Sequence, residues 1–266
     1  MPFMFLPLWC AACSSGTGRL ARTTETPPST TVDSTVPVAA GVRTDLAEVH
    51  AVTALGDSVP YGTACNCDPY PQLTGSDIAQ IASHAVDVSN DSVPGTLSGN
   101  VVHQIQHDPA VITDVEESQA VMVEVGANDV SYSSTCGTNV SCYEAKVPEI
   151  ERNLTTIVER IHALSHGHEK VVVLLDYWSV WLGGQYEKAQ GPDYVNAAET
   201  VTARVDETIH AVARATRSSY VDLRTAFRGP DGTWDETHLL ASDGDHPNAE
   251  GHQRIAQAVA DTVGLR

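Results

Sequence analysis

The chain has 266 residues, of which 42% are hydrophobic and 18% are charged, and this composition suits one globular domain with some additional sequence. Its 34 Asp and Glu residues outnumber its 15 Lys and Arg residues, so the formal net charge at pH 7 is -19. Binding to nucleic-acid phosphates needs clustered Lys and Arg, so we predict no nucleic-acid partner. The acidity favours a solvated surface and does not by itself indicate a substrate.

The first segment, residues 1–13, is an apolar run that is too short to span a bilayer. It resembles the apolar part of a signal peptide, although the usual Lys or Arg near the start is missing. It ends at Cys13 in a sequence that resembles a bacterial lipobox, with Cys10 where Leu is usual. We therefore expect export and lipidation of Cys13, which gives a cell-surface lipoprotein whose lipid is its membrane contact. Plain secretion to the extracellular medium is the alternative.

The next segment, residues 14–44, is rich in Thr, Ser and Pro. Such a stretch cannot bury enough apolar surface to offset the entropy lost on ordering, and its prolines keep it extended. We predict a disordered linker, followed by one folded domain over residues 45–266, and we expect a monomer.

Short apolar runs and helical patterns alternate through this domain. The run at 119–125 is mostly apolar (QAVMVEV), as expected for a strand buried on both faces. Alternating strands and helices predict a parallel sheet with helices on both faces, and active sites in such folds lie beyond the carboxyl ends of the strands. The predicted strands are 50–55, 85–88, 119–125, 170–176 and 219–223, and the predicted helices are 72–83, 99–106, 144–164, 194–216 and 249–263.

Four cysteines lie in the body of the chain, at Cys65, Cys67, Cys136 and Cys142. An even number fits two disulfides and an oxidising compartment. The spacing C-x-C followed by a distant C-x5-C is a poor match to zinc sites, so we predict no metal. Of the three possible pairings we favour Cys136–Cys142 with Cys65–Cys67. Two disulfides that each join Cys65 or Cys67 to Cys136 or Cys142 remain the alternative.

The first motif, Gly56-Asp57-Ser58, directly follows the first predicted strand. Gly56 permits a tight strand-to-helix turn. That turn would expose Ser58 at the amino end of the following helix, where developing negative charge is favoured. Alone, the three residues are also ordinary turn chemistry.

The second and third motifs follow the next two strands. Gly95 can present a backbone N–H to a substrate without obstruction by a side chain, although a Pro-Gly turn is the ordinary interpretation. Asn128, in the sequence Gly-Ala-Asn-Asp over 126–129, carries an amide that can donate to an oxyanion. Its ordinary interpretation is a turn in which Asn and Asp bond to the local backbone.

The fourth motif, Asp243 to His246, directly precedes the last predicted helix. An Asp and a His three residues apart on a turn can meet through a hydrogen bond from Nδ1 to the carboxylate. That bond would leave Nε2 free to accept a proton from Ser58. Asp245 is adjacent to His246, so we expect its side chain to diverge, and we select Asp243 as the orienting acid.

Taken together, the four motifs resemble the SGNH, or GDSL, hydrolase family. The family is named for a Ser, a Gly, an Asn and a His, which correspond here to Ser58, Gly95, Asn128 and His246. The resemblance covers about residues 50–264, with Val59-Pro60 after the Ser as a departure. It implies a three-layer α/β/α, flavodoxin-like sandwich with a five-stranded parallel sheet.

The resemblance also implies a serine hydrolase of the carboxylesterase, lipase or acetylesterase type. Ser58 would form the acyl-enzyme, His246 would act as general base and Asp243 would orient it. Ser58, Gly95 and Asn128 would form the oxyanion hole, without a cofactor. The substrate would be a small-molecule or polysaccharide-linked ester; short-chain ester, lipid, acetylated polysaccharide and thioester all remain open. Candidate pocket walls are the aromatic residues that follow strand ends or motifs, namely Tyr61, Tyr70, Tyr132, Tyr177 and Trp178.

Three alternative interpretations fit the sequence less well. The G-x-S-x-G elbow of α/β-hydrolases fails at Pro60, which stands where Gly is needed. A non-catalytic, ligand-binding lipoprotein on the same fold is the other class, and the complete set of catalytic residue types argues against it. His103 and His107 have a spacing that can bind metal, but Gln104 replaces the Glu of zinc proteases, so a solvated helix face is preferred.

Overall fold

The computed structural model describes residues 48–265. The expectations for residues 1–13, for the linker 14–44 and for lipidation of Cys13 concern residues outside this range. Between residues 48 and 265, no helix is both long enough and apolar enough to cross a membrane.

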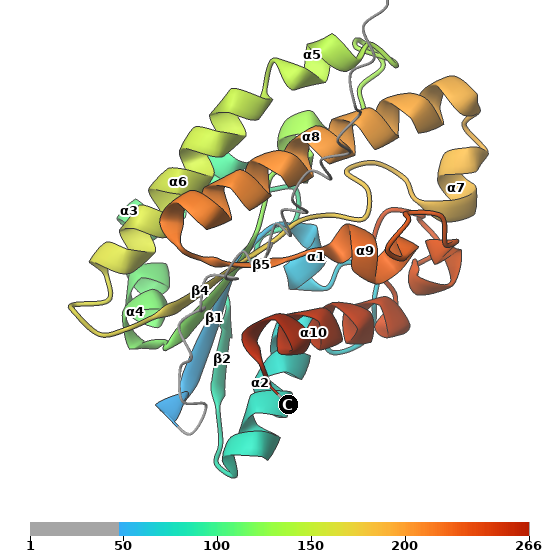
Figure 1. Cartoon of the computed structure of the whole chain (residues 1–266). Helices are drawn as coiled ribbons and strands as arrows, with labels where there is room; N and C mark the ends of the chain where they lie inside the picture. The colour runs from blue at the N-terminus through green and yellow to red at the C-terminus, as the bar shows by residue number, and fades with distance from the viewer. Residues whose placement is uncertain (1–47, 266) are drawn as a thin grey trace, which may run out of the picture. The chain divides into compact units, whose positions relative to one another are not determined.

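A sheet of five parallel strands forms the centre of the structure, in the order β2-β1-β3-β4-β5 (Figure 1). The predicted parallel sheet is confirmed, and each predicted strand end lies within two residues of the observed one. The strands are β1 (Ala51–Gly56), β2 (Asp87–Asn90), β3 (Ala120–Glu124), β4 (Val171–Leu175) and β5 (Ser219–Val221).

Helices cover both faces of the sheet and make the three layers of the fold (Figure 1). One face carries α3 (Ser98–His107), α4 (Pro109–Glu117), α6 (Val147–Ala163) and α8 (Pro192–Thr216). The other face carries α2 (Tyr70–Ala82), α9 (Leu223–Arg228) and α10 (Ala249–Val263). The shorter helices are α1 (Ser58–Tyr61), η2 (Ala127–Val130), α5 (Val140–Glu144), α7 (Gly184–Lys188) and η3 (Glu236–Leu239).

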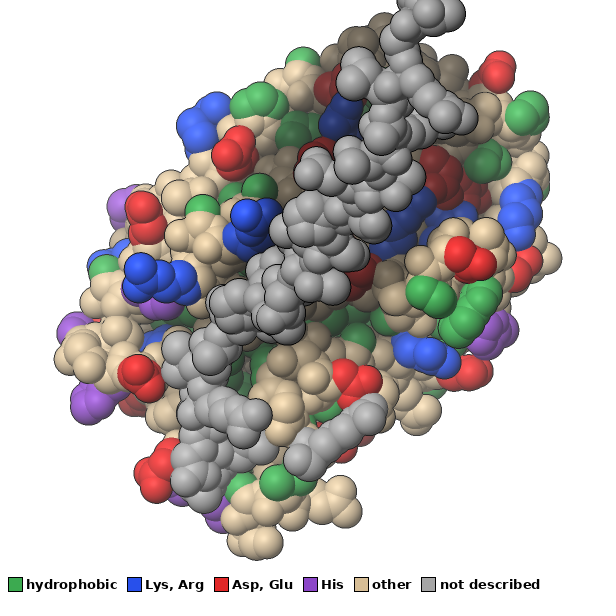
Figure 2. Space-filling view, viewed as in Figure 1, with side chains coloured by type: hydrophobic (Ala, Val, Ile, Leu, Met, Phe, Trp, Pro, Cys, Tyr) green, Lys and Arg blue, Asp and Glu red, His purple; other side chains and the backbone are tan. Residues whose placement is uncertain are grey.

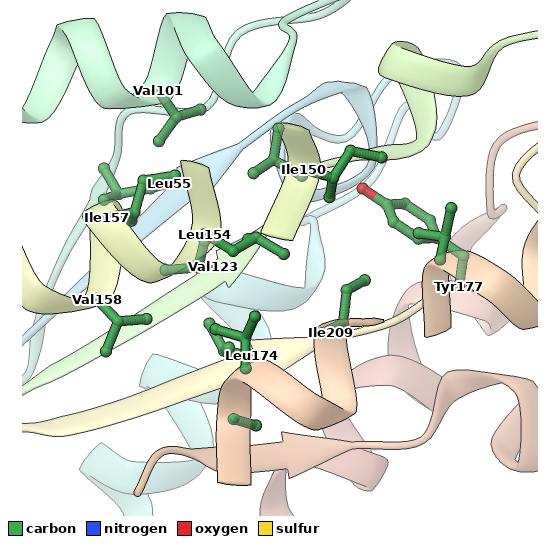
Figure 3. Packing of buried hydrophobic residues seen from close by; sticks show 14 of the residues in the cluster. Leu55, Val101, Val123, Ile150, Leu154, Ile157, Val158, Leu174, Tyr177 and Ile209 are labelled. Atoms are coloured by element: carbon green, nitrogen blue, oxygen red, sulfur yellow. The ribbon is translucent and has the colours of Figure 1, made fainter. Parts of the chain in front are cut away.

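The central strands β1, β3 and β4 are largely apolar on both sides because each side faces a helical layer. In β4, Leu174 packs into the core beneath α6 and α8, whereas its neighbour Val173 packs into the core beneath α2 and α10. This alternation follows from the period of two in a strand. Figure 3 shows the first of these cores, in which Leu55 and Val123 from neighbouring strands face Leu154 of α6.

The helix predictions differ from the structure at two places. The helix predicted at 144–164 begins three residues later, as α6 at Val147 with Pro148 in its first turn, and the short α5 that ends at Glu144 was not predicted. Proline is suited to a helix start because the first N–H groups have no intrahelical acceptor. Helix α4 was not predicted, although Asp108 caps it through a bond from the Ala110 N–H and Pro109 opens it.

Both disulfides of the favoured pairing are present. Cys65 is bonded to Cys67 and Cys136 to Cys142, with Cα–Cα distances of 5.2 and 5.8 Å. Each bond therefore closes a single loop, one after α1 and the other after η2. The alternative that joins the two loops to each other is not the pairing in the structure.

Charged side chains are spread over the surface. In the face that Figure 2 shows, acidic and basic side chains are interspersed between polar and apolar groups. The large negative net charge is therefore not gathered into one acidic patch on the visible part of that face. This distribution fits the expected solvated surface.

Candidate active site

Between β1 and β3 the direction in which successive strands are added to the sheet reverses, and the carboxyl ends of these two strands mark that point. From β1 the chain passes to β2 on one side, and from β2 it crosses to β3 on the other side of β1. A crevice opens at such a point in open parallel sheets. Ser58 follows β1 and Asn128 follows β3, so these two candidate residues lie on either side of the crevice.

The turn that carries Ser58 is fixed by its two preceding residues. Gly56 has a φ of +155°, and a Cβ added to it would lie 2.1 Å from the carbonyl oxygen of Glu124. The next N–H, that of Asp57, donates to that same carbonyl oxygen at 3.2 Å. Only glycine allows β1 and β3 to approach this closely, which explains the Gly before the Asp-Ser pair.

Asp57 is a structural residue beneath the candidate nucleophile. It is buried, its Oδ1 accepts from the Val59 N–H at 3.1 Å, and its Oδ2 accepts from the Tyr177 hydroxyl at 2.8 Å. Burial raises the pKa of Asp57 to about 6, and these two bonds oppose the rise. As the first residue of α1, Ser58 has a backbone N–H without an intrahelical partner, which leaves it available to a substrate.

His246 and Asp243 meet as the spacing predicted. Nδ1 of His246 lies 2.8 Å from Oδ2 of Asp243. The other carboxylate oxygen, Oδ1, accepts from the backbone N–H groups of Asp245 and His246, both at 3.1 Å. Partial burial raises the pKa of Asp243, but the bonds from His246 and these N–H groups hold it below its usual value. An ionised Asp243 therefore fixes both the turn and the imidazole ring.

The expectation that the Asp245 side chain diverges from His246 was wrong. Its Oδ2 lies 4.0 Å from Nε2 of His246, and the residue lines the same cavity. The Asp243 carboxylate occupies the inside of the turn, where it bonds to two N–H groups and the ring. Gly244, with a φ of +75°, then redirects the chain so that Asp245 faces the cavity.

The two remaining oxyanion candidates lie on adjoining loops. Asn128, in η2, lines the cavity, and its Nδ2 donates to the carbonyl of Thr96 at 3.2 Å. Gly95 has a φ of +76° and lies outside the residues that line the cavity. Within residues 48–265 the Gly95 N–H has no hydrogen-bond acceptor. A Cβ added to Gly95 would meet nothing within 4 Å, so its surroundings are open.

A hydrogen-bonded chain of three residues joins these loops, and the sequence interpretation did not include it. The carboxylate of Asp129 accepts from the Ser98 N–H at 2.9 Å and from the Ser98 hydroxyl at 2.7 Å. The same hydroxyl accepts from Nδ2 of Asn153, in α6, at 2.8 Å. The available signal was the Asp that directly follows Asn128 in the third motif.

A cavity of about 350 Å³ brings the candidate residues together. Ser58, Asn128 and His246 all line it. Of the five aromatic residues considered from sequence, three line it: Tyr132, Tyr177 and Trp178. The other two do not, because Tyr70 is fully buried in the core and Tyr61 is 54% exposed outside the cavity.

Trp181 and Tyr194 were missed as cavity residues. Together with Tyr132 they form an aromatic cluster, with ring centroids 5.1 to 5.2 Å apart. Trp181 lies in the loop after β4 and Tyr194 in the first turn of α8. Both are buried, but nothing in the sequence shows that they border the same cavity.

One described group could offer three metal-ligand atoms. The sulfurs of Cys65 and Cys67 and a ring nitrogen of His252 lie within 4.8 Å of one another. The two sulfurs are bonded to each other, however, and Nδ1 of His252 already accepts from the Tyr70 N–H at 3.2 Å. A disulfide offers no thiolate, so this group does not fit a metal site.

The family model of GDSL-like lipases and acylhydrolases matches residues 54–254. The chain belongs to this family. It is therefore a hydrolase from a family of ester hydrolases. A comparison with curated proteins finds no match.

Solved structures of the family share the fold at low sequence identity. A lipase from a goat rumen metagenome has a TM-score of 0.61 at 15% identity, covering 80% of this chain and 96% of its own. The acetylxylan esterase Axe2 of Geobacillus stearothermophilus has a TM-score of 0.59 at 19% identity, covering 82% and 95%. A putative GDSL-like lipase of Parabacteroides merdae has a TM-score of 0.61 at 15% identity, covering 81% and 96%.

Proposed function

We propose that the protein hydrolyses esters through an acyl-enzyme on Ser58, with His246 as general base and Asp243 as its orienting acid. The observation that carries this proposal is the 2.8 Å contact between Nδ1 of His246 and Oδ2 of Asp243, at the wall of the cavity that Ser58 also lines. With Nδ1 engaged, the neutral ring has its lone pair at Nε2, on the side of the cavity.

In the first half-reaction Oγ of Ser58 attacks the acyl carbon while its proton passes to Nε2 of His246. The negative charge that develops on the carbonyl oxygen is met by the backbone N–H groups of Ser58 and Gly95 and by the Asn128 amide. The bond to the alcohol oxygen then breaks, and Nε2 gives its proton to the leaving alcohol. Water repeats the sequence on the acyl-serine and releases the acid.

For substrate, we propose a small-molecule or polysaccharide-linked ester. The cavity is lined by aromatic and small polar side chains, a mixture that suits sugar rings as well as acyl chains. Likeness to an acetylxylan esterase and to lipases places acetylated polysaccharides and lipid esters first in a substrate screen.

We also propose that the protein is exported, with residues 1–13 as the signal and Cys13 as a lipid attachment site. Two disulfides in the folded domain support an oxidising compartment. The full chain expressed in a bacterium should partition with membranes, and Cys13→Ser should release it. A wild-type protein that is wholly soluble, with its mature amino terminus elsewhere, contradicts the lipid anchor.

A serine-reactive fluorophosphonate probe tests the nucleophile directly. Wild-type protein should be labelled, and Ser58→Ala should lose both the label and nearly all ester hydrolysis, since loss of such a nucleophile costs on the order of a millionfold in kcat. Ser131, which lines the same cavity, gives the matched control, because Ser131→Ala should still be labelled. Labelling of Ser58→Ala, or more than a few per cent residual activity in a clean preparation, would overturn the assignment.

A further inference from the structure

The cavity carries negative charge and no positive side chain. None of the described residues that line it is Lys or Arg, whereas two of them, Asp57 and Asp245, are acids. Asp57 is buried and already accepts from the Val59 N–H and the Tyr177 hydroxyl. Asp245 is therefore the acid that remains available to a ligand in the cavity.

The Asp245 carboxylate has no hydrogen-bond donor among residues 48–265. The neighbouring N–H groups of the turn donate to Asp243 instead, and Nε2 of His246 lies 4.0 Å from Oδ2 of Asp245, beyond hydrogen-bond distance. The Asp245 side chain is 51% exposed, so a ligand can reach it from the cavity. Burial against the wall raises the pKa of Asp245, and a bound cation would oppose that rise.

An aromatic wall faces the same space. The rings of Tyr132, Trp181 and Tyr194 lie against one another and all line the cavity. The Tyr194 ring is fixed because its hydroxyl accepts from the Leu182 N–H at 3.3 Å. Asp245 and Tyr194 line the same cavity; burial raises the pKa of Tyr194, and the charge of Asp245 adds to the rise. Aromatic faces attract ammonium groups, most strongly where water is excluded.

The position of Asp245 also indicates which part of an ester would carry the cation. The leaving oxygen must come within about 3 Å of Nε2 of His246 to receive its proton. Oδ2 of Asp245 lies 4.0 Å from that same nitrogen. The carboxylate is thus at most about 7 Å from the leaving oxygen, given hydrogen-bond reach at Nε2. In an ester of choline or a similar amino alcohol, the charged nitrogen is separated from that oxygen by two carbon atoms.

We propose that the active site prefers esters whose alcohol part carries an ammonium group, held by Asp245 and the wall of Tyr132, Trp181 and Tyr194. The preference rests on the ester hydrolysis proposed above and adds a substrate class to it. Asp245 acts as a specificity residue that binds the alcohol, whereas Asp243 orients the base.

Two acetate esters of nearly equal shape test this preference. Acetylcholine carries a quaternary ammonium, and 3,3-dimethylbutyl acetate has a neutral carbon in its place. Wild-type kcat/KM should favour acetylcholine by about fivefold to tenfold at low salt, the range of a cation bound by one carboxylate and aromatic faces. The preference should shrink as salt is added, because the charges are screened.

Asp245→Asn should bring the ratio of the two kcat/KM values towards one, and the ratio cancels any effect on chemistry common to both esters. Asp77→Asn is the matched control, because Asp77 is an exposed residue on α2 and its substitution changes the net charge equally. The control should keep the wild-type ratio. A wild-type ratio of one or less, or equal ratios in wild type and Asp245→Asn, would overturn the proposal.

Inhibition by tetramethylammonium gives an independent measurement. It should compete with 3,3-dimethylbutyl acetate in the wild type and bind about fivefold to tenfold more weakly to Asp245→Asn, for the same electrostatic reason. Equal inhibition of the two proteins contradicts the subsite. Failure of the catalytic proposal looks different, since Ser58→Ala would then hydrolyse the neutral ester as the wild type does.

Discussion

The carboxylate of Asp129 holds Ser98 by two hydrogen bonds, one from its N–H at 2.9 Å and one from its hydroxyl at 2.7 Å. Ser98 closes the loop that carries Gly95, and Asp129 directly follows Asn128. The pair therefore sets the spacing between two of the proposed oxyanion donors. Burial raises the pKa of Asp129 and the bonds from Ser98 oppose the rise.

Asp129→Ala should consequently lower kcat for a neutral ester more than it changes KM. Removing one oxyanion donor outright costs about 100-fold to 1,000-fold, so misplacing two donors should cost roughly 10-fold to 100-fold. Asp108→Ala removes another Asp that caps a backbone N–H, at the start of α4, and should affect stability without this loss in kcat. Equal kcat values for the two variants would show that Asp129 does not position the oxyanion donors.

The loss in kcat should differ sharply between the two acids beside His246 when each is replaced by Asn. Asp243→Asn should lower kcat for a neutral ester by about 10⁴-fold, because the tautomer of His246 is no longer fixed. Asp245→Asn should cost far less with that ester, since its carboxylate does not bond to Nδ1. Steady-state kinetics decide this, and similar losses for both variants, or the reverse order, would contradict the choice of Asp243.

Asp57 should make stability depend on pH. Its pKa in the folded protein is about 6, above its ordinary value of 3.8, so the folded state binds this proton more tightly than the unfolded state does. The free energy of unfolding should fall as pH rises from about 4 to about 6, by about 3 kcal/mol from this group, and this contribution should level off above pH 6.

Asp57→Asn cannot titrate and should lack that slope. Urea denaturation of both proteins from pH 4 to pH 7 measures the difference between their unfolding free energies. The buried His252, whose pKa is lowered by burial to about 4, has the opposite slope, but it is present in both proteins and cancels. Parallel curves would show that Asp57 is not protonated in the fold at mild acid pH.

The disulfides should matter more to the active-site rim than to global stability. Each closes a loop within one segment, with sequence separations of 2 and 6. Loops this short add less than the roughly 4 kcal/mol expected of a bridge between distant segments. Mild reduction should lower activity, while the far-ultraviolet circular dichroism spectrum should remain that of the folded protein. Non-reducing peptide mapping checks the pairing, and a peptide that links the two loops would contradict it.

The centre of the sheet was predictable because β1, β3 and β4 are buried on both faces, so each appears as a short apolar run between helical patterns. The order of the catalytic motifs along the chain was predictable for the same reason, since each follows a strand or precedes the last helix. Short helices such as α4 and α7, with 9 and 5 residues, were missed because so few residues do not show a clear periodicity.

Contacts between distant segments were not predictable from spacing. Trp181 in the loop after β4 and Tyr194 in the first turn of α8 come together with Tyr132, which follows η2, and a sequence shows only that each is aromatic. The direction of Asp245 was missed for a local reason. Adjacent residues often diverge, but here the Asp243 carboxylate fills the inside of the turn, and the backbone at Gly244 turns the next side chain towards the cavity.

The proposed base, His246, comes later in the sequence than the nucleophile and the oxyanion donors. When a ribosome has synthesised the first 240 residues, Ser58, Gly95 and Asn128 are already present in the nascent chain. His246 and the helix α10 that follows it have not yet been made. Domains begin to fold during synthesis, so the nucleophile can be in place before anything can activate it. The proposed hydrolysis therefore depends on the segment that carries His246, and it cannot begin until α10 has packed against the sheet.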